Sequence, residues 1–405
     1  MYSRRNLIWG ALALIIAVEG IVLLLRPEAA HAPISIDTST ASSSPAQFAN
    51  AGLAVESATA SPLEAPPAEV VHSSTVVSAS EPAPAPVKQK ISTSPTITAR
   101  PQLPVSSGQG VAVRIANPYD TAPQSFSAIN DSTRAALVNI LCTSAGAIRP
   151  ISGSGVIIDS RGIILTNAHV AQYVLLAQSD AVNLSCTIRT GSPARAAWKA
   201  EVLYIPPVWV SQHISDFNAG QAVTGTGEHD YAFLLVSDTL DGTPLPKHFS
   251  YLPTDTREAI GFLGDEVIVA GYPAEFLGVA AEYSLYPLAS ATTIKQLLTF
   301  GSGAVDLISV GSVIEAQSGS SGGAITNPWG RLIGVITTTS AGATVDQREL
   351  RALSLSYVDR DLKTQAGVSL EGLLSGSVSD TAASFNATIA PTMLQQYLAR
   401  LQTTQ

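Results

Sequence analysis

The chain has 405 residues, of which 46% are apolar and 13% are charged, so it can bury a sizeable core and is neither wholly disordered nor a coiled coil. Its 22 Lys and Arg against 31 Asp and Glu give a net charge of −9, and no basic run could track a phosphate backbone, so we expect no nucleic-acid partner. Two cysteines exclude a four-cysteine zinc cage and a dense disulfide framework but allow one disulfide.

The N-terminal region contains an apolar run at residues 7–25 with a single charge, Glu19. This length suits a helix that crosses a bilayer and exceeds a usual signal-peptide core. Because two arginines precede the run, we expect a signal anchor that spans the cell membrane once, with residues 1–6 cytoplasmic and the rest extracytoplasmic. A signal peptide cleaved after Ala30-His31-Ala32 is the alternative, and Glu19 either faces a partner helix or is a tolerated charge.

Residues 26–125 are predicted to be a disordered linker. They hold 14 of the 25 prolines, mixed with Ala, Ser and Thr, and contain no tryptophan. Such a composition cannot bury enough apolar surface to offset the entropy of ordering. We expect a tether with a random-coil reach of roughly 50–60 Å.

The sequence changes character at about Phe126. A helical pattern at 127–137 leads into many short β-patterned runs that Gly, Pro, Asn and Asp separate, including 156–158, 163–165, 231–236, 267–269 and 332–336. Strands at this density, with no long helices between them, indicate an all-β domain built as an antiparallel barrel or sandwich. We place this domain at 126–375 and a C-terminal extension with a short amphipathic helix at 376–405.

The first candidate site segment is 153–169, a predicted hairpin with an Asp-Ser-Arg-Gly turn that places His169 just after a buried strand. A rigid strand end gives this imidazole the fixed position that a general base requires. Alone, the histidine could equally be structural.

The second segment is 229–236, in which Asp230 stands at the start of an apolar strand. A carboxylate there could accept the imidazole Nδ1–H and fix its tautomer. Since successive strand side chains point to opposite faces, we expect the neighbouring His229 to lie on the surface.

The third segment is Gly319-Ser320-Ser321-Gly322-Gly323-Ala324. Glycines around a serine pair predict a tight turn in which the amides of Gly319 and Ser321 can point at one spot, as an oxyanion hole requires. Ser320 or Ser318 could be mistaken for the nucleophile, and a plain Gly/Ser loop is the simplest alternative. The order His, Asp, Ser along the chain disfavours that alternative.

With these segments in this order, the chain resembles the trypsin-like (chymotrypsin-fold) serine peptidases, and it is most similar to the bacterial Deg/HtrA-type branch, whose histidine segment resembles 166–170. The resemblance implies two packed antiparallel β-barrels with short flanking helices and a site in the cleft between them. It makes Ser321 the nucleophile, His169 the general base and acid, Asp230 the orienting carboxylate, and the Gly319 and Ser321 amides the oxyanion donors. It implies no cofactor and no metal.

Two departures from the family pattern stand out. Ser320 occupies the position where digestive members carry an aspartate that pairs with a newly cut N-terminus, so we expect no proteolytic activation. The segment after the last expected strand is too short for a PDZ domain, so we expect none.

Two features give opposite predictions for the residue cleaved. The resemblance places Glu315 at the base of the specificity pocket, where a carboxylate favours Lys or Arg. It also places Thr337, Thr338 and Thr339 along the substrate, where the β-branched Thr339 should narrow the entrance. We therefore expect a small or medium apolar residue at the cleaved position, with Glu315 either neutralised by an arginine such as Arg351 or turned away.

The sequence thus predicts a membrane-anchored serine endopeptidase that cleaves polypeptide substrates through an acyl-enzyme. The alternative is a catalytically silent peptidase fold that serves as a tethered binding module. The extracytoplasmic location also permits a disulfide between Cys142 and Cys186, with two buried free thiols as the alternative.

Overall fold

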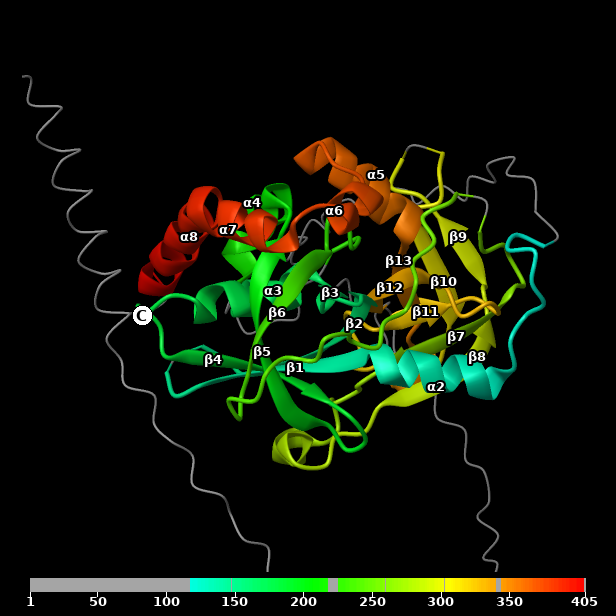
Figure 1. Cartoon of the computed structure of the whole chain (residues 1–405), viewed down its shortest axis with the longest axis horizontal. Helices are drawn as coiled ribbons and strands as arrows, with labels where there is room; N and C mark the ends of the chain where they lie inside the picture. The colour runs from blue at the N-terminus through cyan, green and yellow to red at the C-terminus, as the bar shows by residue number, and fades with distance from the viewer. Residues whose placement is uncertain are drawn as a thin grey trace, which may run out of the picture. The chain divides into compact units, whose positions relative to one another are not determined.

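Two antiparallel β-sheets form the body of the chain (Figure 1). The structure is a computed structural model that describes residues 117–146, 148–217, 225–258, 260–301, 303–339 and 344–403. The expected membrane span at 7–25 and most of the expected linker lie outside these ranges. Within them, none of the helices has the length and apolar character needed to cross a bilayer.

The first sheet closes into a barrel with the strand order β1-β2-β3-β6-β5-β4. Its strands are β1 (Leu137–Ser144), β2 (Ile151–Asp159), β3 (Ile163–Thr166), β4 (Leu184–Thr190), β5 (Arg195–Tyr204) and β6 (Ala232–Thr239). The predicted β2–β3 hairpin is confirmed: the Gly162 amide donates to the Asp159 carbonyl over 3.0 Å, and Gly162 takes the positive φ, +88°, that this turn needs.

The second sheet has seven strands in the order β8-β7-β11-β12-β13-β10-β9. They are β7 (Glu266–Gly271), β8 (Leu288–Thr293), β9 (Gln296–Leu298), β10 (Leu307–Gly311), β11 (Ala324–Thr326), β12 (Leu332–Thr339) and β13 (Leu350–Ser354). The prediction of two antiparallel barrels is thus confirmed as two barrel-like sheets. The first closes, whereas the described strands of the second end at β8 and β9.

Short helices flank the sheets. They are α2 (Phe126–Ala136), α3 (Ala168–Ala177), α4 (Pro207–His213), α5 (Leu355–Ala366), α6 (Leu370–Ser375), α7 (Val378–Thr388) and α8 (Ala390–Thr403), with 3-10 turns η1 (Ile214–Asp216), η2 (Gly278–Glu282) and η3 (Val345–Gln347). The Ser125 hydroxyl caps α2, the helix expected at 127–137. The C-terminal extension holds two helices, α7 and α8, instead of the single one expected, because Ser377 provides a second N-cap.

The C-terminal helices cover the first barrel. In Figure 1, α7 and α8 lie on the side of that barrel that also carries α3 and α4. Phe385 of α7 packs edge-on against Tyr204 of β5, and Tyr397 of α8 packs edge-on against Phe217 with ring centroids 4.9 Å apart. Because Tyr397 has no exposed surface, α8 belongs to the hydrophobic core of this half.

The segment 117–124, which is part of the predicted linker, lies against the second sheet. The Tyr119 hydroxyl donates to Asp255 over 2.6 Å and accepts from the Asn327 amide, also over 2.6 Å. The guanidinium of Arg257 lies 5.0 Å from the centre of the Tyr119 ring. Residues 117–124 therefore pack on the domain that is predicted to begin at Phe126.

The disulfide prediction is confirmed. Cys142 of β1 and Cys186 of β4 are directly opposite each other in the barrel, and their sulfurs are bonded. Register explains the pairing, because facing residues on neighbouring antiparallel strands bring their Cβ atoms close together.

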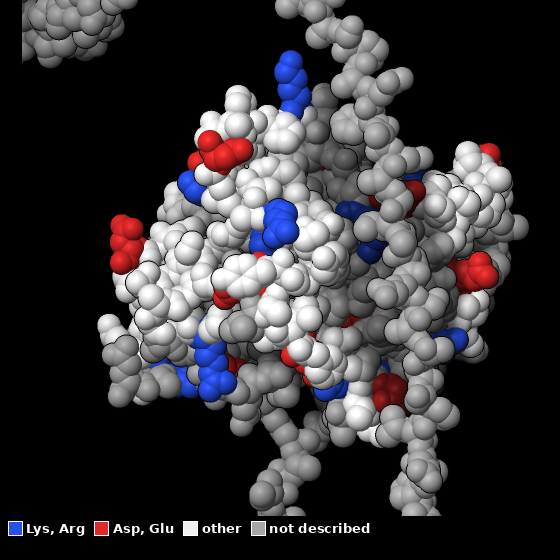
Figure 2. Space-filling model, turned by 90° about the horizontal axis from the view of Figure 1, so that it is seen from below, with Lys and Arg blue, Asp and Glu red and all other residues white. Residues whose placement is uncertain are grey.

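Charged side chains are dispersed on the face that Figure 2 shows. Basic and acidic residues are interspersed among neutral ones there, with no large area of one sign.

Candidate active site

His169 stands in the first turn of α3, directly after β3 ends. Its Nδ1 lies 2.8 Å from Asp230 Oδ2, and its backbone N–H donates to Asp230 Oδ1 over 3.0 Å. The Asn167 side chain also donates to the Asp230 carbonyl over 2.7 Å. These three bonds fix the imidazole, with Nδ1 on the carboxylate and Nε2 turned away from it.

Asp230 is buried just before β6, and Thr337 of β12 completes its hydrogen bonding. The Thr337 hydroxyl donates to Asp230 Oδ2 over 2.8 Å. Burial by itself would raise the pKa of Asp230, but the charge and hydrogen bonds of His169, with help from Thr337, outweigh it and lower the pKa. The carboxylate is therefore ionised, although it is only 4% exposed.

Ser321 lies in the turn between β10 and β11 and is half-buried. The turn docks on the first barrel, since the Ser154 amide of β2 donates to the Ser321 carbonyl over 2.7 Å. At Gly322, a Cβ atom would lie 2.0 Å from the Ser154 carbonyl oxygen and 2.5 Å from Thr166 Oγ1. Only glycine permits this approach, which brings Ser321 to the strand end that carries His169.

The structure thus brings His169, Asp230 and Ser321 to the junction of the two sheets. Within the described residues, no hydrogen bond joins Ser321 Oγ to His169 Nε2. Such bonds are often long before a substrate binds.

The backbone around Ser321 leaves two amides without an acceptor. Neither Gly319 N–H nor Ser321 N–H donates a hydrogen bond to any described part of the chain. The Ser318 carbonyl is held by the Ala274 amide over 2.8 Å. Since a trans peptide points its C=O and N–H in opposite directions, the Gly319 N–H faces away from Ala274. Both amides are therefore available to a bound group, as the predicted oxyanion hole requires.

Three threonines, Thr337 to Thr339, end β12, and the structure describes the side chain of the first. The Thr337 side chain, expected along the substrate, is buried and bonded to Asp230. The backbones of Thr338 and Thr339 pair with Arg351 and Leu350 of β13. The side chains of Thr338 and Thr339 lie outside the described part, so the expected narrowing of the pocket stays a prediction.

Glu315 is fully buried. Its Oε1 accepts from the Ser290 hydroxyl of β8 over 2.7 Å, and its Oε2 has no partner among the described residues. The expectation that Arg351 neutralises it is wrong, because Arg351 binds Glu349 instead. Burial raises the pKa of Glu315, only partly opposed by the Ser290 hydrogen bond. Burial therefore favours the neutral form of this carboxyl, which has no arginine partner among the described residues.

His229 is not the surface residue that the alternation of strand side chains predicts. Its Nδ1 lies 2.9 Å from Asp361 Oδ2 of α5, and its side chain is 13% exposed. The prediction failed because His229 is not in a strand: its φ is +61°, and β6 begins only at Ala232. Its amide donates to the Tyr357 hydroxyl over 3.0 Å, which ties the backbone before Asp230 to α5.

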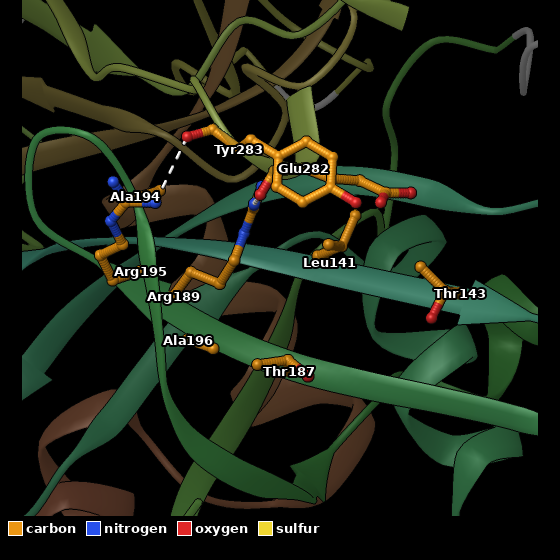
Figure 3. A pocket seen from close by; sticks show the side chains of 9 residues that line it. All are labelled: Leu141, Thr143, Thr187, Arg189, Ala194, Arg195, Ala196, Glu282 and Tyr283. Atoms are coloured by element: carbon orange, nitrogen blue, oxygen red, sulfur yellow. Dashed lines mark hydrogen bonds between the residues drawn. The ribbon is translucent and has the colours of Figure 1, made fainter. Parts of the chain in front are cut away.

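A pocket of about 430 Å³ lies away from these residues, between strands of the first barrel and the segment that contains η2 (Figure 3). Arg189, Arg195 and Tyr283 line it, whereas His169 and Ser321 do not. It is therefore separate from the candidate active site.

Part of the chain is similar to known peptidases. Residues 153–335 match the family model described as "Trypsin-like peptidase domain", a range that contains His169, Asp230 and Ser321. A solved structure, the serine endoprotease from Yersinia pestis, is 21% identical, with 60% of this chain and 68% of that chain covered and a TM-score of 0.38. No curated protein matches the chain.

Proposed function

We propose that the chain is a serine endopeptidase, anchored in the cell membrane by residues 7–25, that cleaves extracytoplasmic polypeptides. The observation that carries the catalytic part is the docked turn around Ser321. It packs against Thr166, at the strand end before His169, and its Gly319 and Ser321 amides have no acceptor among the described residues. The family model over 153–335 supports the same reaction class. The membrane part rests on the sequence alone.

In the proposed reaction, Ser321 Oγ attacks the carbonyl carbon of a peptide bond while His169 Nε2 takes the hydroxyl proton. The carbonyl electrons move onto oxygen, where the two amides stabilise the negative charge. His169 then gives its proton to the leaving amine as the C–N bond breaks. Water, activated by the same histidine, releases the acid product and regenerates Ser321.

Asp230 and Thr337 act through His169. The carboxylate fixes the tautomer that keeps Nε2 free to accept a proton, and it stabilises the imidazolium that forms. The Thr337 hydroxyl helps keep this buried carboxylate ionised. The substrate strand would lie along the end of β12, and the preference for a small or medium apolar residue is part of the proposal.

Hydrolysis of an unfolded protein substrate by the purified full chain tests the reaction. We expect cleavage by the wild type and none by Ser321→Ala. Ser320→Ala is the matched control: it removes the hydroxyl of the neighbouring residue, which is only 1% exposed, and should keep activity. A folded wild-type chain that does not cleave but binds polypeptides would instead support the alternative, a silent binding module.

A further inference from the structure

The segment 272–287 between β7 and β8 forms hydrogen bonds with the turn that precedes Ser321. The Ala274 amide donates to the Ser318 carbonyl over 2.8 Å, and Glu275 Oε2 accepts from the Ser318 amide over 3.0 Å. Ala274 and Glu275 thus bind the backbone carbonyl and the backbone amide of the same residue, Ser318. This unit directly precedes Gly319, whose amide is one of the two oxyanion donors proposed above.

Arg348 fixes the Glu275 side chain in place. Its Nη1 lies 2.6 Å from Glu275 Oε2, and its Nη2 lies 2.9 Å from Oε1, which makes the pair bidentate. Both side chains are mostly buried, at 19% and 22% exposure. The hydrogen bond from Arg348 lowers the pKa of Glu275 below its usual range, so the carboxylate is charged and its bond to Ser318 is charge-assisted.

Other contacts confine the same turn. A Cβ atom at Gly319, where φ is +100°, would lie 2.6 Å from the Tyr272 carbonyl oxygen. The Ser154 hydroxyl donates to the Gly319 carbonyl over 2.7 Å. If the peptide between Ser318 and Gly319 turned over, the Ser318 carbonyl would occupy the place of the oxyanion donor, and repulsion would replace stabilisation.

The other end of the segment 272–287 is bonded to the first barrel, and this restricts the movement of the residues that bind Ser318. The Ala194 amide donates to the Leu285 carbonyl over 2.7 Å, and Arg189 donates to the carbonyls of Ala281 and Glu282, each over 3.0 Å. Figure 3 shows Arg189 and Arg195 reaching from their strands toward this end of the segment. Residues held by such a second set of contacts keep their geometry during a reaction.

We propose that Glu275 is a positioning residue for the oxyanion hole: together with Arg348 it sets the direction of the Gly319 amide by holding Ser318. This inference rests on the proposed function. Glu275 touches neither the substrate nor the reacting atoms, so its removal should slow the chemical step more than it weakens substrate binding.

Steady-state kinetics of the full chain on a peptide substrate test the proposal with three variants. Glu275→Ala removes the acceptor, and we expect kcat to fall about 10- to 100-fold with KM nearly unchanged, somewhat less than the roughly 10²- to 10³-fold loss for removing an oxyanion donor. Glu275→Gln keeps an acceptor oxygen but loses the ion pair, and Arg348→Gln loses the partner. Both should fall between Glu275→Ala and the wild type.

Glu349→Gln is the matched control. Glu349 also pairs with an arginine and is also 22% exposed, but it does not contact Ser318. It should keep wild-type kcat. The proposal is overturned if Glu275→Ala keeps the wild-type kcat. It is also overturned if Glu349→Gln loses as much kcat as Glu275→Gln.

Hydrogen exchange separates this inference from the proposed function. The Ser318 amide should exchange faster in Glu275→Ala than in the wild type, at an unchanged melting temperature. A wild-type chain that neither cleaves nor reacts with a serine-directed probe would overturn the proposed function. Faster exchange of the Ser318 amide in Glu275→Ala would then still show that Glu275 holds Ser318. Unchanged exchange in Glu275→Ala would overturn the role of Glu275, whatever the activity.

Discussion

Two buried carboxyl groups, those of Asp230 and Glu315, differ in the partners around them. Asp230 accepts hydrogen bonds from His169 and Thr337 and is ionised, whereas Glu315 has one hydroxyl donor and a raised pKa. The first arrangement favours the charged form, and the second favours the neutral form. Their contributions to stability therefore depend on pH in opposite directions.

The Glu315 carboxyl should stabilise the fold most at low pH. Because its folded-state pKa is raised above the ordinary value of 4.5, its contribution is complete below 4.5 and is lost as the pH rises through the folded-state pKa. In the wild type, the free energy of unfolding should therefore fall as the pH rises through this range. In Glu315→Gln, this part of the fall should be absent. Denaturant unfolding at a series of pH values measures it, and equal slopes in both proteins would contradict the assignment.

The proposed nucleophile and base should behave as one unit. Ser321→Ala and His169→Ala should each reduce kcat by several orders of magnitude without unfolding the chain. The double variant should be little slower than either single one, because each removes the same reaction path. Losses that multiply in the double variant would argue against shared catalysis.

Single-residue patterns predicted part of the site and missed the rest for a physical reason. His169, Asp230 and Ser321 could be found because each stands at a recognisable strand end or glycine turn. Thr337 was expected along the substrate, but its bond to Asp230 could not be predicted, and Glu275 could not be found at all. Both depend on contacts between segments far apart in the chain. No periodicity in the sequence encodes such contacts.

At the scale of elements, strand register decides which side chains meet. The short β-patterned runs predicted the strands, and the Asp-Ser-Arg-Gly turn predicted the β2–β3 hairpin. The pairing of β1 with β4, which places Cys142 opposite Cys186, is non-local and follows only from barrel closure. The disulfide prediction therefore depended on the cysteine count and the expected compartment.

Reduction of the disulfide should destabilise the first barrel. The bond joins residues 44 apart, and a closed loop of this length contributes about 3–4 kcal/mol in the chain-entropy model. We expect the free energy of unfolding to fall by that amount in reductant. A Cys142→Ala/Cys186→Ala variant should not respond to reductant, and an equal stability of the oxidised and reduced wild type would contradict the prediction.

At the scale of the whole molecule, residues 117–124, which composition alone assigns to the linker, pack on the second sheet. Proline-rich composition predicts disorder, but Tyr119 and Trp329 pack with ring centroids 5.2 Å apart, and Arg257 lies over the Tyr119 ring. Composition averages over many residues and cannot detect one aromatic anchor. Contacts of residues 117–124 with the domain therefore escape an analysis of composition.

Truncation tests this boundary and the absence of an activation step together. A fragment of residues 117–405 should be as active as longer forms, because Ser320 supplies no charge to pair with a new N-terminus. A fragment of residues 126–405 should unfold about 1–3 kcal/mol more easily, since it loses the contacts of Tyr119. Equal stability of the two fragments, or a jump in activity after one particular cut, would contradict these predictions.

The most direct test of the account is the structure of the chain after reaction with a fluorophosphonate. We expect one covalent adduct, on Ser321 Oγ, with its phosphonyl oxygen about 2.7–3.1 Å from both the Gly319 and the Ser321 amide nitrogens. An adduct on another residue, or no adduct in the folded protein, would contradict the assignment of Ser321 as the nucleophile. An adduct on Ser321 whose phosphonyl oxygen points away from both amides would contradict the proposed oxyanion hole.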